Sequence, residues 1–221
     1  MDNDNSVTNK QNETRSRLIA KLLPYIRKNG FLSIRMDEIA KIMDVSRATL
    51  YKYFSTKEEI IGYVVDFCIE YLNELIVDSP DTDQRFGTRF QQIFEQSVLL
   101  MDTDVFLKEL ENSYPEPYER LRESMKQREQ QVLVFYEDGM RRGIFNEINA
   151  KLLIKQDELL RSIFEVKYLM ENQLTVHQVL YDYYKLKKIQ LFKPEKLQAV
   201  EDSMMIAKIE YFAQKITKNL Y

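Results

Sequence analysis

Apolar side chains recur three or four positions apart along most of this chain, which is the spacing of one buried helix face. The predicted helices span residues 13–28, 36–43, 46–54, 57–77, 84–101, 104–111, 118–142, 150–171, 176–192 and 194–217. The chain contains five Gly and five Pro among 221 residues, and so few helix-breaking residues favour long helices over many short strands. The pattern therefore predicts an all-α fold without a strand or a tandem repeat.

Two of the shortest predicted helices, residues 36–43 and 46–54, meet at a corner formed by Asp44 and Val45. At 100° per residue, Leu50 and Phe54 point the second helix inward, so its opposite face is exposed. The exposed face and its flanks carry Arg47, Ala48, Thr49, Tyr51, Lys52 and Tyr53. Short side chains at 48 and 49 allow close approach to base edges, which is typical of a helix-turn-helix that enters the DNA major groove.

Capping residues mark where these helices begin and end. Gly30 suits the left-handed position that follows a helix, and Ser46 is suited to cap the helix that begins after it. Ser55 and Thr56 each precede a glutamate by three positions, which predicts two overlapping capping boxes at the start of the next helix. Lys57 lies in that first turn, where a phosphate would be bound favourably.

Charge is distributed unevenly along the chain. Residues 1–60 carry 11 Lys and Arg against 8 Asp and Glu, a net charge of +3, whereas the remainder carries 21 against 27, a net charge of −6. A basic N-terminal segment on an acidic body is the charge pattern of a nucleic-acid-binding module joined to a domain that does not bind nucleic acid. An ordinary solvated surface would explain the charge equally well without the helix-turn-helix.

Several other classes of function are disfavoured. No apolar run approaches the roughly 20 residues of a membrane span, and residues 1–13 lack the layout of a signal peptide. A single cysteine, Cys68, excludes an internal disulfide, fits the cytoplasm, and lies in an apolar stretch as a small core residue. The single histidine, His177, has no nucleophile or metal partner nearby in sequence. We therefore expect no enzyme activity, no metal and no cofactor.

Residues 13–65 resemble the DNA-binding domain of the tetracycline-repressor (TetR) family of transcriptional regulators. The matching positions are Gly30-Phe31, Ile39-Ala40, Asp44-Val45-Ser46, Leu50-Tyr51, Tyr53-Phe54 and Lys57. Two positions depart from the family pattern. Arg35 replaces the usual capping Thr or Ser, so the cap is expected at Ser33, and Asp44 replaces the usual glycine of the corner, where Asp tolerates left-handed backbone well.

The resemblance implies which residues contact the DNA operator. They are Arg35, Arg47, Ala48, Thr49, Tyr51, Lys52, Tyr53 and Lys57. It also implies three parts of the chain: a disordered tail (1–12), a helix-turn-helix domain (13–60) and a helical body for effector binding and dimerisation (61–221). In that layout, the last long helices pair with those of a second subunit.

Periodicity in the body leaves two alternatives open. An apolar stripe in residues 196–217 fits either a dimer interface or the core of one subunit; its members are Leu197, Val200, Met204, Ile206, Ile209, Phe212, Ala213 and Ile216. Candidate effector-binding residues in the middle helices are Phe94, Met101, Phe106, Met125, Phe135, Tyr136, Met140 and Phe164. Methionine adapts to irregular ligands, but the same residue types at helical spacing are more often plain core.

We therefore expect a cytoplasmic, homodimeric transcriptional repressor that binds a palindromic double-stranded DNA operator through helix 46–54. A lipophilic or aromatic small molecule in the C-terminal body is expected to release it. The alternative hypothesis is a helix-turn-helix protein whose helical body binds a protein partner and lacks a small-molecule response.

Overall fold

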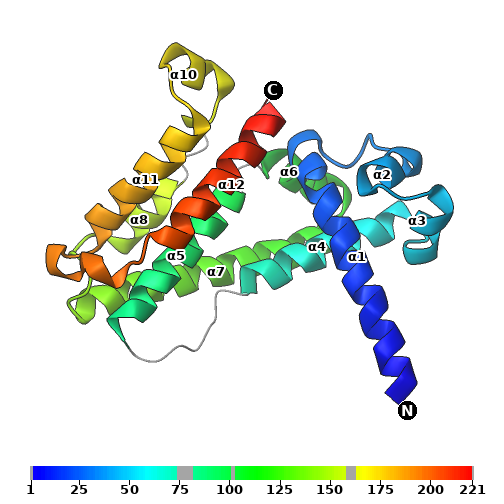
Figure 1. Cartoon of the computed structure of the whole chain (residues 1–221). Coiled ribbons are helices and arrows are strands. Elements are labelled where there is room, and N and C mark those ends of the chain that lie inside the picture. The colour runs from blue at the N-terminus through cyan, green and yellow to red at the C-terminus, as the bar shows by residue number, and fades with distance from the viewer. Residues whose placement is uncertain (1, 74–81, 101–102, 158–162, 221) are drawn as a thin grey trace. The chain divides into compact units, whose positions relative to one another are not determined.

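The computed structural model describes residues 2–73, 82–100, 103–157 and 163–220, and it is all-α as predicted. The helices before residue 114 are α1 (Asp2–Asn29), α2 (Met36–Met43), α3 (Arg47–Tyr53), α4 (Lys57–Asn73), α5 (Asp83–Leu100) and α6 (Asp104–Ser113). After it follow α7 (Pro115–Arg141), α8 (Ala150–Asp157), α10 (Val166–Glu171), α11 (Val176–Leu191), the 3₁₀ helix η1 (Pro194–Ala199) and α12 (Ser203–Leu220). Figure 1 shows these helices along the chain.

The chain divides into two compact units, and α7 contributes to both. Unit 1 comprises residues 1–74 and 102–127, and unit 2 comprises residues 75–101 and 128–221. In unit 1, α1 packs against α2, α4 and α6, and α2 packs against α3. The buried apolar side chains of this unit include Leu22, Ile26, Ile39, Met43, Leu50, Phe54, Ile60 and Val64. Leu50 and Phe54 are thus core residues, as their spacing predicts.

The core of unit 2 is unusually aromatic. Phe145 lies at the centre of one group of rings, with centroids 4.8 Å from Phe192, 5.2 Å from Phe135 and 5.4 Å from Phe86. Gly139 in α7 makes this arrangement possible, because a Cβ atom there would lie 2.1 Å from the Phe145 ring. Rings in edge-to-face contact add stabilisation beyond the area they bury.

Several predicted boundaries differ from the structure. Residues 2–12, which we expected to be a disordered tail, continue α1 as helix; they contain neither Gly nor Pro, and a helix already formed extends at little cost. Unit 1 also includes residues 102–127, which the predicted boundary at residue 60 assigns to the body. The predicted helix 150–171 is interrupted at residues 164–165, and the predicted end of helix 57–77 lies outside the described residues.

The predicted helix 194–217 is two elements, η1 and α12, separated by non-helical residues 200–202. Side chains from neighbouring helices hold this break. Gln91 donates to the Glu201 carbonyl at 2.6 Å, and Asp202 accepts from Tyr184 and Lys188, each at 2.7 Å. The break is therefore a tertiary effect that the local apolar pattern does not contain.

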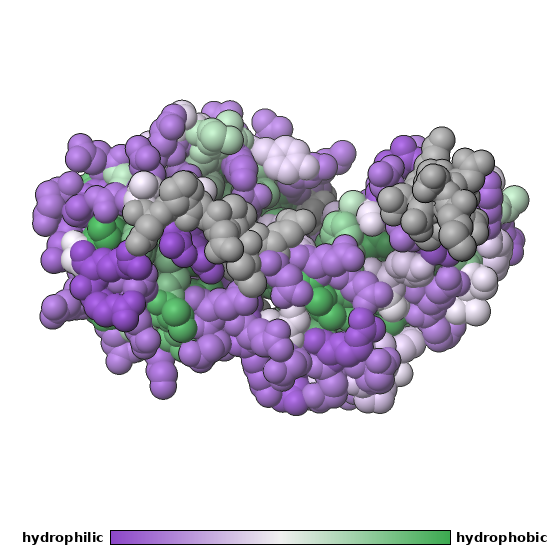
Figure 2. Space-filling model, turned by 90° about the horizontal axis from the view of Figure 1, so that it is seen from below, coloured by the Kyte–Doolittle hydropathy of each residue, from purple (hydrophilic) through white to green (hydrophobic). Residues whose placement is uncertain are grey.

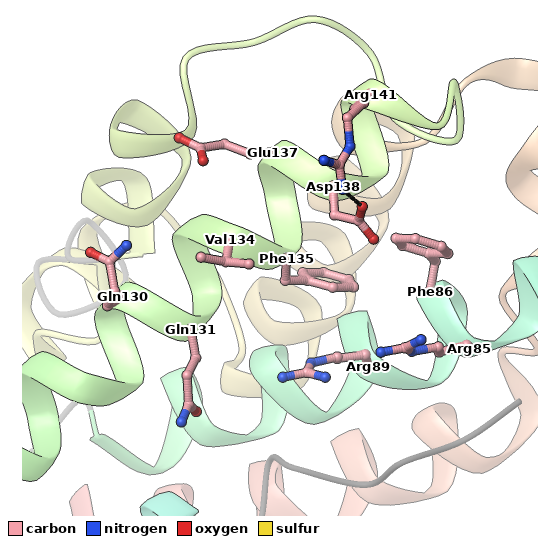
Figure 3. Close-up of a pocket in the computed structure, with 10 residues that line it drawn as sticks. All are labelled: Arg85, Phe86, Arg89, Gln130, Gln131, Val134, Phe135, Glu137, Asp138 and Arg141. Carbon is pink, nitrogen blue, oxygen red and sulfur yellow. Dashed lines mark hydrogen bonds and ion pairs between the residues drawn. The ribbon is translucent and has the colours of Figure 1, made fainter. Parts of the chain in front are cut away.

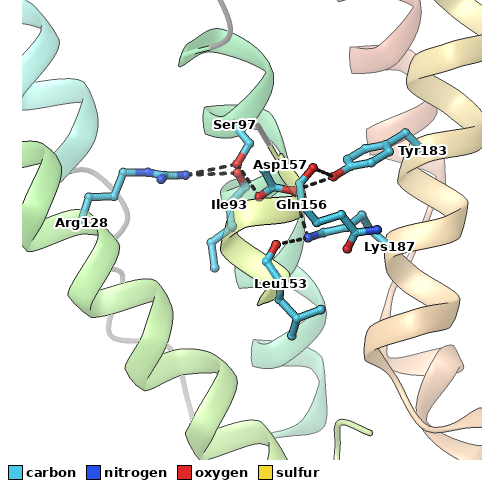
Figure 4. A network of polar contacts seen from close by, with 8 residues as sticks. All are labelled: Ile93, Ser97, Arg128, Leu153, Gln156, Asp157, Tyr183 and Lys187. Carbon is cyan, nitrogen blue, oxygen red and sulfur yellow. Dashed lines mark hydrogen bonds and ion pairs between the residues drawn. The ribbon is translucent and has the colours of Figure 1, made fainter. Parts of the chain in front are cut away.

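A polar network lies inside unit 2, between α5, α7, α8 and α11 (Figure 4). The Lys187 ammonium, 3% exposed, donates to the Leu153 carbonyl at 2.8 Å and to the Asp157 carboxylate at 2.9 Å. The same carboxylate accepts from the hydroxyls of Tyr183 at 2.9 Å and Ser97 at 3.1 Å. Each charge therefore has an opposite partner and additional hydrogen bonds, which offset the cost of removing it from water.

Among the described residues, no helix is both long enough and apolar enough to span a bilayer. On the face shown in Figure 2, hydrophobic surface appears as small separate patches within a mainly hydrophilic surface.

Lys187→Met should destabilise the protein by about 3–5 kcal/mol, because it leaves the Asp157 carboxylate buried without its ammonium. Urea unfolding followed by circular dichroism measures the change. Lys185→Met, at an exposed position of the same helix, is the matched control and should cost less than about 1 kcal/mol. Equal losses in the two variants would contradict the stabilising role of this pair.

Candidate nucleic-acid interface

The corner between α2 and α3 has the geometry that its residues predict. Asp44 adopts left-handed backbone, with φ 57° and ψ 52°, and ends α2. Ser46 is the N-cap of α3, and its hydroxyl accepts from the Thr49 N–H at 3.1 Å. Lys21 from α1 donates to the Met43 carbonyl at 3.2 Å. Both ends of the corner are thereby fixed, so the direction in which α3 projects is fixed as well.

The loop between α1 and α2 is held from two sides by opposite charges. The Lys57 ammonium of α4 donates to the carbonyls of Leu32 at 2.8 Å and Ile34 at 2.9 Å. The Glu109 carboxylate of α6 accepts from the N–H groups of Phe31 and Leu32. The Lys57 pKa is lowered by burial, which the carboxylate of Glu109 partly offsets. We call these two side chains with the loop backbone the Lys57–Glu109 clamp.

Gly30 is required at the start of this loop for two independent reasons. Its φ of 77° is the left-handed conformation that glycine adopts without strain. A Cβ atom there would also lie 2.3 Å from a carboxylate oxygen of Glu109. The predicted end of the first helix is confirmed, and the close approach of α6 is an additional constraint.

Arg15 of α1 fixes the other end of α3. Its Nε donates to the Tyr53 carbonyl at 3.1 Å, and its Nη1 donates to the Tyr63 hydroxyl at 2.5 Å. The guanidinium carbon lies 4.7 Å from the centroid of the Tyr63 ring, a cation–π contact. α3 is therefore attached to α1 and α4 where its main chain ends.

The caps of the neighbouring helices match the prediction only in part. Thr56 caps α4, because its hydroxyl accepts from the Glu59 N–H at 3.1 Å. The Glu59 carboxylate in turn accepts from the Ser55 N–H at 2.6 Å. The expected cap at Ser33 is wrong, because Arg35 is the N-cap of α2. Glu38 accepts from the Arg35 N–H at 2.8 Å, so the glutamate half of a capping box remains.

Six of the predicted DNA-contacting residues lie on α3, while Arg35 is the N-cap of α2 and Lys57 begins α4. Exposed are Arg35, Arg47, Ala48, Tyr51 and Lys52, and half-buried are Thr49, Tyr53 and Lys57. Several of them also have contacts within the protein. The Thr49 hydroxyl lies 2.8 Å from that of Ser46, and Lys57 belongs to the clamp. The contacts of these eight residues with DNA stay predictions.

Three side chains that hold this surface were missed by sequence reasoning: Arg15, Lys21 and Glu109. Each contacts backbone far away in sequence, 78 residues away in the case of Glu109 and Phe31. Hydrophobic spacing carries no information about such contacts. The large number of basic residues before Lys57 was the one available signal. It indicates that some of these charges hold the fold while others face solvent, but it does not say which.

The predicted effector-binding residues are distributed over both units of the chain. Phe94, Phe135, Tyr136 and Phe164 are buried in the core of unit 2, and Met140 packs against that core. Phe106 and Met125 belong to unit 1, and Met101 lies outside the described residues. Of this set, Phe135 lines the cleft described between α5 and α7. Most of these residues are thus packed among core side chains, and their contact with an effector stays a prediction.

Cys68 lies on α4 of unit 1, and His177 lies on α11 of unit 2. His177 is exposed and stacks on Tyr181, with ring centroids 6.1 Å apart. Burial raises the pKa of the Cys68 thiol to about 11, although the positive charge of Arg27 acts in the opposite direction. Among the described residues, no group of three or more His, Cys, Asp or Glu side chains is placed to hold a metal ion.

Sequence comparisons identify relatives of the N-terminal region. Residues 25–64 match the family model described as "Bacterial regulatory proteins, tetR family". The biofilm operon icaADBC HTH-type negative transcriptional regulator IcaR of Staphylococcus aureus (strain Newman) is 26% identical over 82 residues, 37% of this chain. The chain spans 44% of the length of that relative. IcaR of Staphylococcus epidermidis is 22% identical over 163 residues, which cover 70% of this chain and 86% of the relative.

Solved structures show the same fold over most of the chain. The ketosteroid transcriptional regulator KstR2 of Mycobacterium tuberculosis superposes with a TM-score of 0.53 at 17% identity, covering 81% of this chain and 95% of KstR2. The TetR family protein CprB from S. coelicolor A3(2) gives a TM-score of 0.54 at 14% identity and covers 93% and 98% of the two chains.

Lys57→Met should lower the free energy of unfolding by about 1–3 kcal/mol, because two loop carbonyls lose a charged donor. Urea unfolding followed by circular dichroism tests this. Lys41→Met removes the same charge from an exposed position of α2 and should change stability by less than about 0.5 kcal/mol. A Lys57 variant as stable as the Lys41 variant would argue against the clamp.

Alkylation of Cys68 by iodoacetamide should be slow at pH 8 and accelerate up to about pH 11, since the thiolate is the nucleophile and the thiol pKa is about 11. The initial rate against pH, measured by mass spectrometry on the folded protein, gives the apparent pKa. A rate that levels off near pH 8.5, the pKa of an ordinary cysteine, would contradict the burial of this thiol.

Proposed function

We propose that this chain, which belongs to the tetR family of bacterial regulatory proteins, represses transcription by binding a palindromic operator as a homodimer. α3 enters the major groove of each half-site, and a small-molecule effector bound in the C-terminal body releases the DNA. DNA binding is assigned to residues 13–60, and effector binding and dimerisation to residues within 61–221. Negative regulation of transcription by the IcaR relatives supports repression rather than activation.

One observation carries the DNA-binding role: α3 is held rigidly at both ends and presents short side chains outward. Ser46 and Lys21 fix the corner before it, and Arg15 holds the carbonyl at its end. Between these points Ala48 is exposed and Thr49 half-buried, so the backbone of α3 can approach base edges closely.

Arg47 and Lys52 on α3 and Arg35 at the start of α2 add exposed positive charge. Arginine and lysine contacts to phosphates fix the position of a protein on DNA, whereas contacts to base edges select the sequence. Arg47 lies 3.5 Å from Asp37 across the corner, an exposed ion pair that a phosphate can replace at small cost.

Exposed apolar residues on the last two long helices support the homodimer. On α11, Leu186 is 54% and Ile189 61% exposed, and on α12, Met204 is 72% and Tyr211 56% exposed. The members of each pair are three or seven positions apart, so each pair lies on one helix face. Of the stripe predicted in residues 196–217, Val200, Ile209, Phe212 and Ala213 are instead buried within the subunit. Two-fold symmetry of such a dimer would match the two halves of a palindrome.

Effector release requires that the ligand bind one conformation of the protein more tightly than the other. Its differential affinity sets the largest change in DNA affinity that it can cause. We propose a lipophilic or aromatic effector, in keeping with the aromatic composition of unit 2.

Thr49→Ala should relax sequence preference at one base pair of the operator half-site by about 1–3 kcal/mol, because it removes a methyl and a hydroxyl from the α3 face. Selection of bound duplexes from a random pool, followed by fluorescence anisotropy titrations, measures the preference. Thr49→Ser keeps the hydroxyl that contacts Ser46 and tests the methyl separately. An unchanged preference in both variants would exclude base contact by Thr49.

Lys52→Gln should weaken binding to operator and random duplexes alike and reduce the slope of log K against log salt by about 0.9, the value for one phosphate contact. Anisotropy titrations at several salt concentrations give this slope. Lys155→Gln in the body is the control and should leave the slope unchanged. A wild-type protein whose DNA binding is absent or insensitive to salt would overturn the proposed function.

A further inference from the structure

A cleft in unit 2 lies between α5 and α7 and is separate from the surface around α3. Its volume is about 540 Å³, within the size range of small-molecule sites. It is lined by Arg85, Phe86, Arg89, Gln130, Gln131, Val134, Phe135, Glu137, Asp138 and Arg141 (Figure 3). An aromatic floor, arginines on α5 and an amide on α7 together give it a distinct chemical character.

The apolar part of the cleft is rigid. Phe86 and Phe135 are 5% and 6% exposed, and their rings stack with centroids 5.7 Å apart and planes inclined by 26°. Both rings also pack edge-on against buried Phe145. Val134 lies beside them and is 54% exposed, so it offers apolar surface at the opening. A flat ring placed here would meet a preformed surface, which lowers the entropic cost of binding.

The polar part of the cleft is mainly cationic. Arg85 and Arg89 are one helical turn apart on α5, and in Figure 3 Arg85 lies below Phe86 and Arg89 below Phe135. The Arg89 guanidinium carbon lies 5.8 Å from the centroid of the Phe135 ring. A guanidinium presents a planar fork of donors that matches a carboxylate or sulfonate. Of the two acids in the cleft, Asp138 forms ion pairs with Arg141 and Arg142.

Among the described residues, the side chain of Gln131 has an unsatisfied polar atom, which is independent evidence that the cleft binds a ligand. It lines the cleft, and its side-chain oxygen is buried without a hydrogen-bond partner within the described part of the chain. A buried polar atom without a partner is costly and requires an explanation. The two ends of an amide are interchangeable by rotation, so this side chain can offer an N–H donor to an anion instead.

We propose that the α5–α7 cleft binds a small aromatic molecule that carries a carboxylate or sulfonate group. The ring lies against Phe135, Phe86 and Val134, and the anionic group is bound by Arg85 and Arg89, with Gln131 as an additional donor. The binding site follows from the chemistry of the cleft alone. Its use as the effector site rests on the proposed function, and it makes that effector an organic anion rather than a neutral lipophile.

Two fluorescent probes that differ by one group test this proposal on the full chain. 1-Anilinonaphthalene-8-sulfonate has fused rings and a sulfonate, and N-phenyl-1-naphthylamine has the same rings without the charge. Arg85→Gln combined with Arg89→Gln should weaken the sulfonate about tenfold or more, the effect of losing a charge-assisted hydrogen bond. The uncharged probe should change less than about twofold, because its contacts are apolar.

Matched variants separate the cleft from nonspecific probe binding. Arg122→Gln combined with Lys126→Gln removes the same charge from exposed positions of α7 and should leave both affinities unchanged. Val134→Glu places a carboxylate at the exposed rim without disturbing the core, and it should weaken the sulfonate more than the uncharged probe. Circular dichroism melting of each variant confirms that the fold is retained.

Three results would overturn the proposal: equal affinity of wild type and the Arg85/Arg89 variant for the sulfonate, equal losses of both probes, or equal losses in the control variant. A DNA titration with the same proteins keeps the two proposals apart. Sulfonate binding that depends on the arginines, in a protein that binds no duplex DNA, would support the site and contradict the proposed function. DNA binding in a protein whose probe binding does not depend on the arginines would support the proposed function and contradict the site.

Discussion

The position of α3 depends on how the Lys57–Glu109 clamp satisfies the hydrogen-bonding groups of the loop between α1 and α2. This loop offers the N–H groups of Phe31 and Leu32 to a carboxylate and the carbonyls of Leu32 and Ile34 to an ammonium. Glu109 lies on α6 and Lys57 lies on α4. The attraction between their charges therefore also holds both helices at the loop. Backbone groups that are otherwise without partners become the link between three helices. α2 begins directly after this loop, and the corner and α3 follow from it.

The clamp changes how the basic character of the N-terminal segment is understood. Some of the basic residues in 1–60 hold the fold of unit 1, so only part of their charge is available for contact with DNA. Arg15, Lys21 and Lys57 donate to backbone carbonyls of unit 1, while Arg35, Arg47 and Lys52 face solvent around α3. In unit 2 the same division holds: Lys187 stabilises the interior, and Arg85 and Arg89 line an open cleft.

Local chemistry predicted the helix-turn-helix well, because caps and corners depend on neighbouring residues. Ser46 as N-cap and Asp44 in left-handed backbone needed no knowledge of the rest of the chain. The tertiary contacts could not be predicted from the sequence. The contact of Glu109 with Phe31 spans 78 residues, and the interruption at 200–202 depends on side chains of α5 and α11. Periodicity also cannot separate a core aromatic such as Tyr136 from one that lines a cleft such as Phe135, since both face inward.

The Lys57–Glu109 clamp is expected to hold α3 ready for DNA, and the affinity of Glu109→Met for duplex DNA tests this role directly. Removing a negative charge by itself favours binding to a polyanion, as the control Glu111→Met at an exposed position of α6 should show. The clamp predicts the opposite sign for Glu109→Met: weaker binding than wild type, with the fold retained by circular dichroism. Binding equal to or tighter than that of the Glu111 variant would contradict the account.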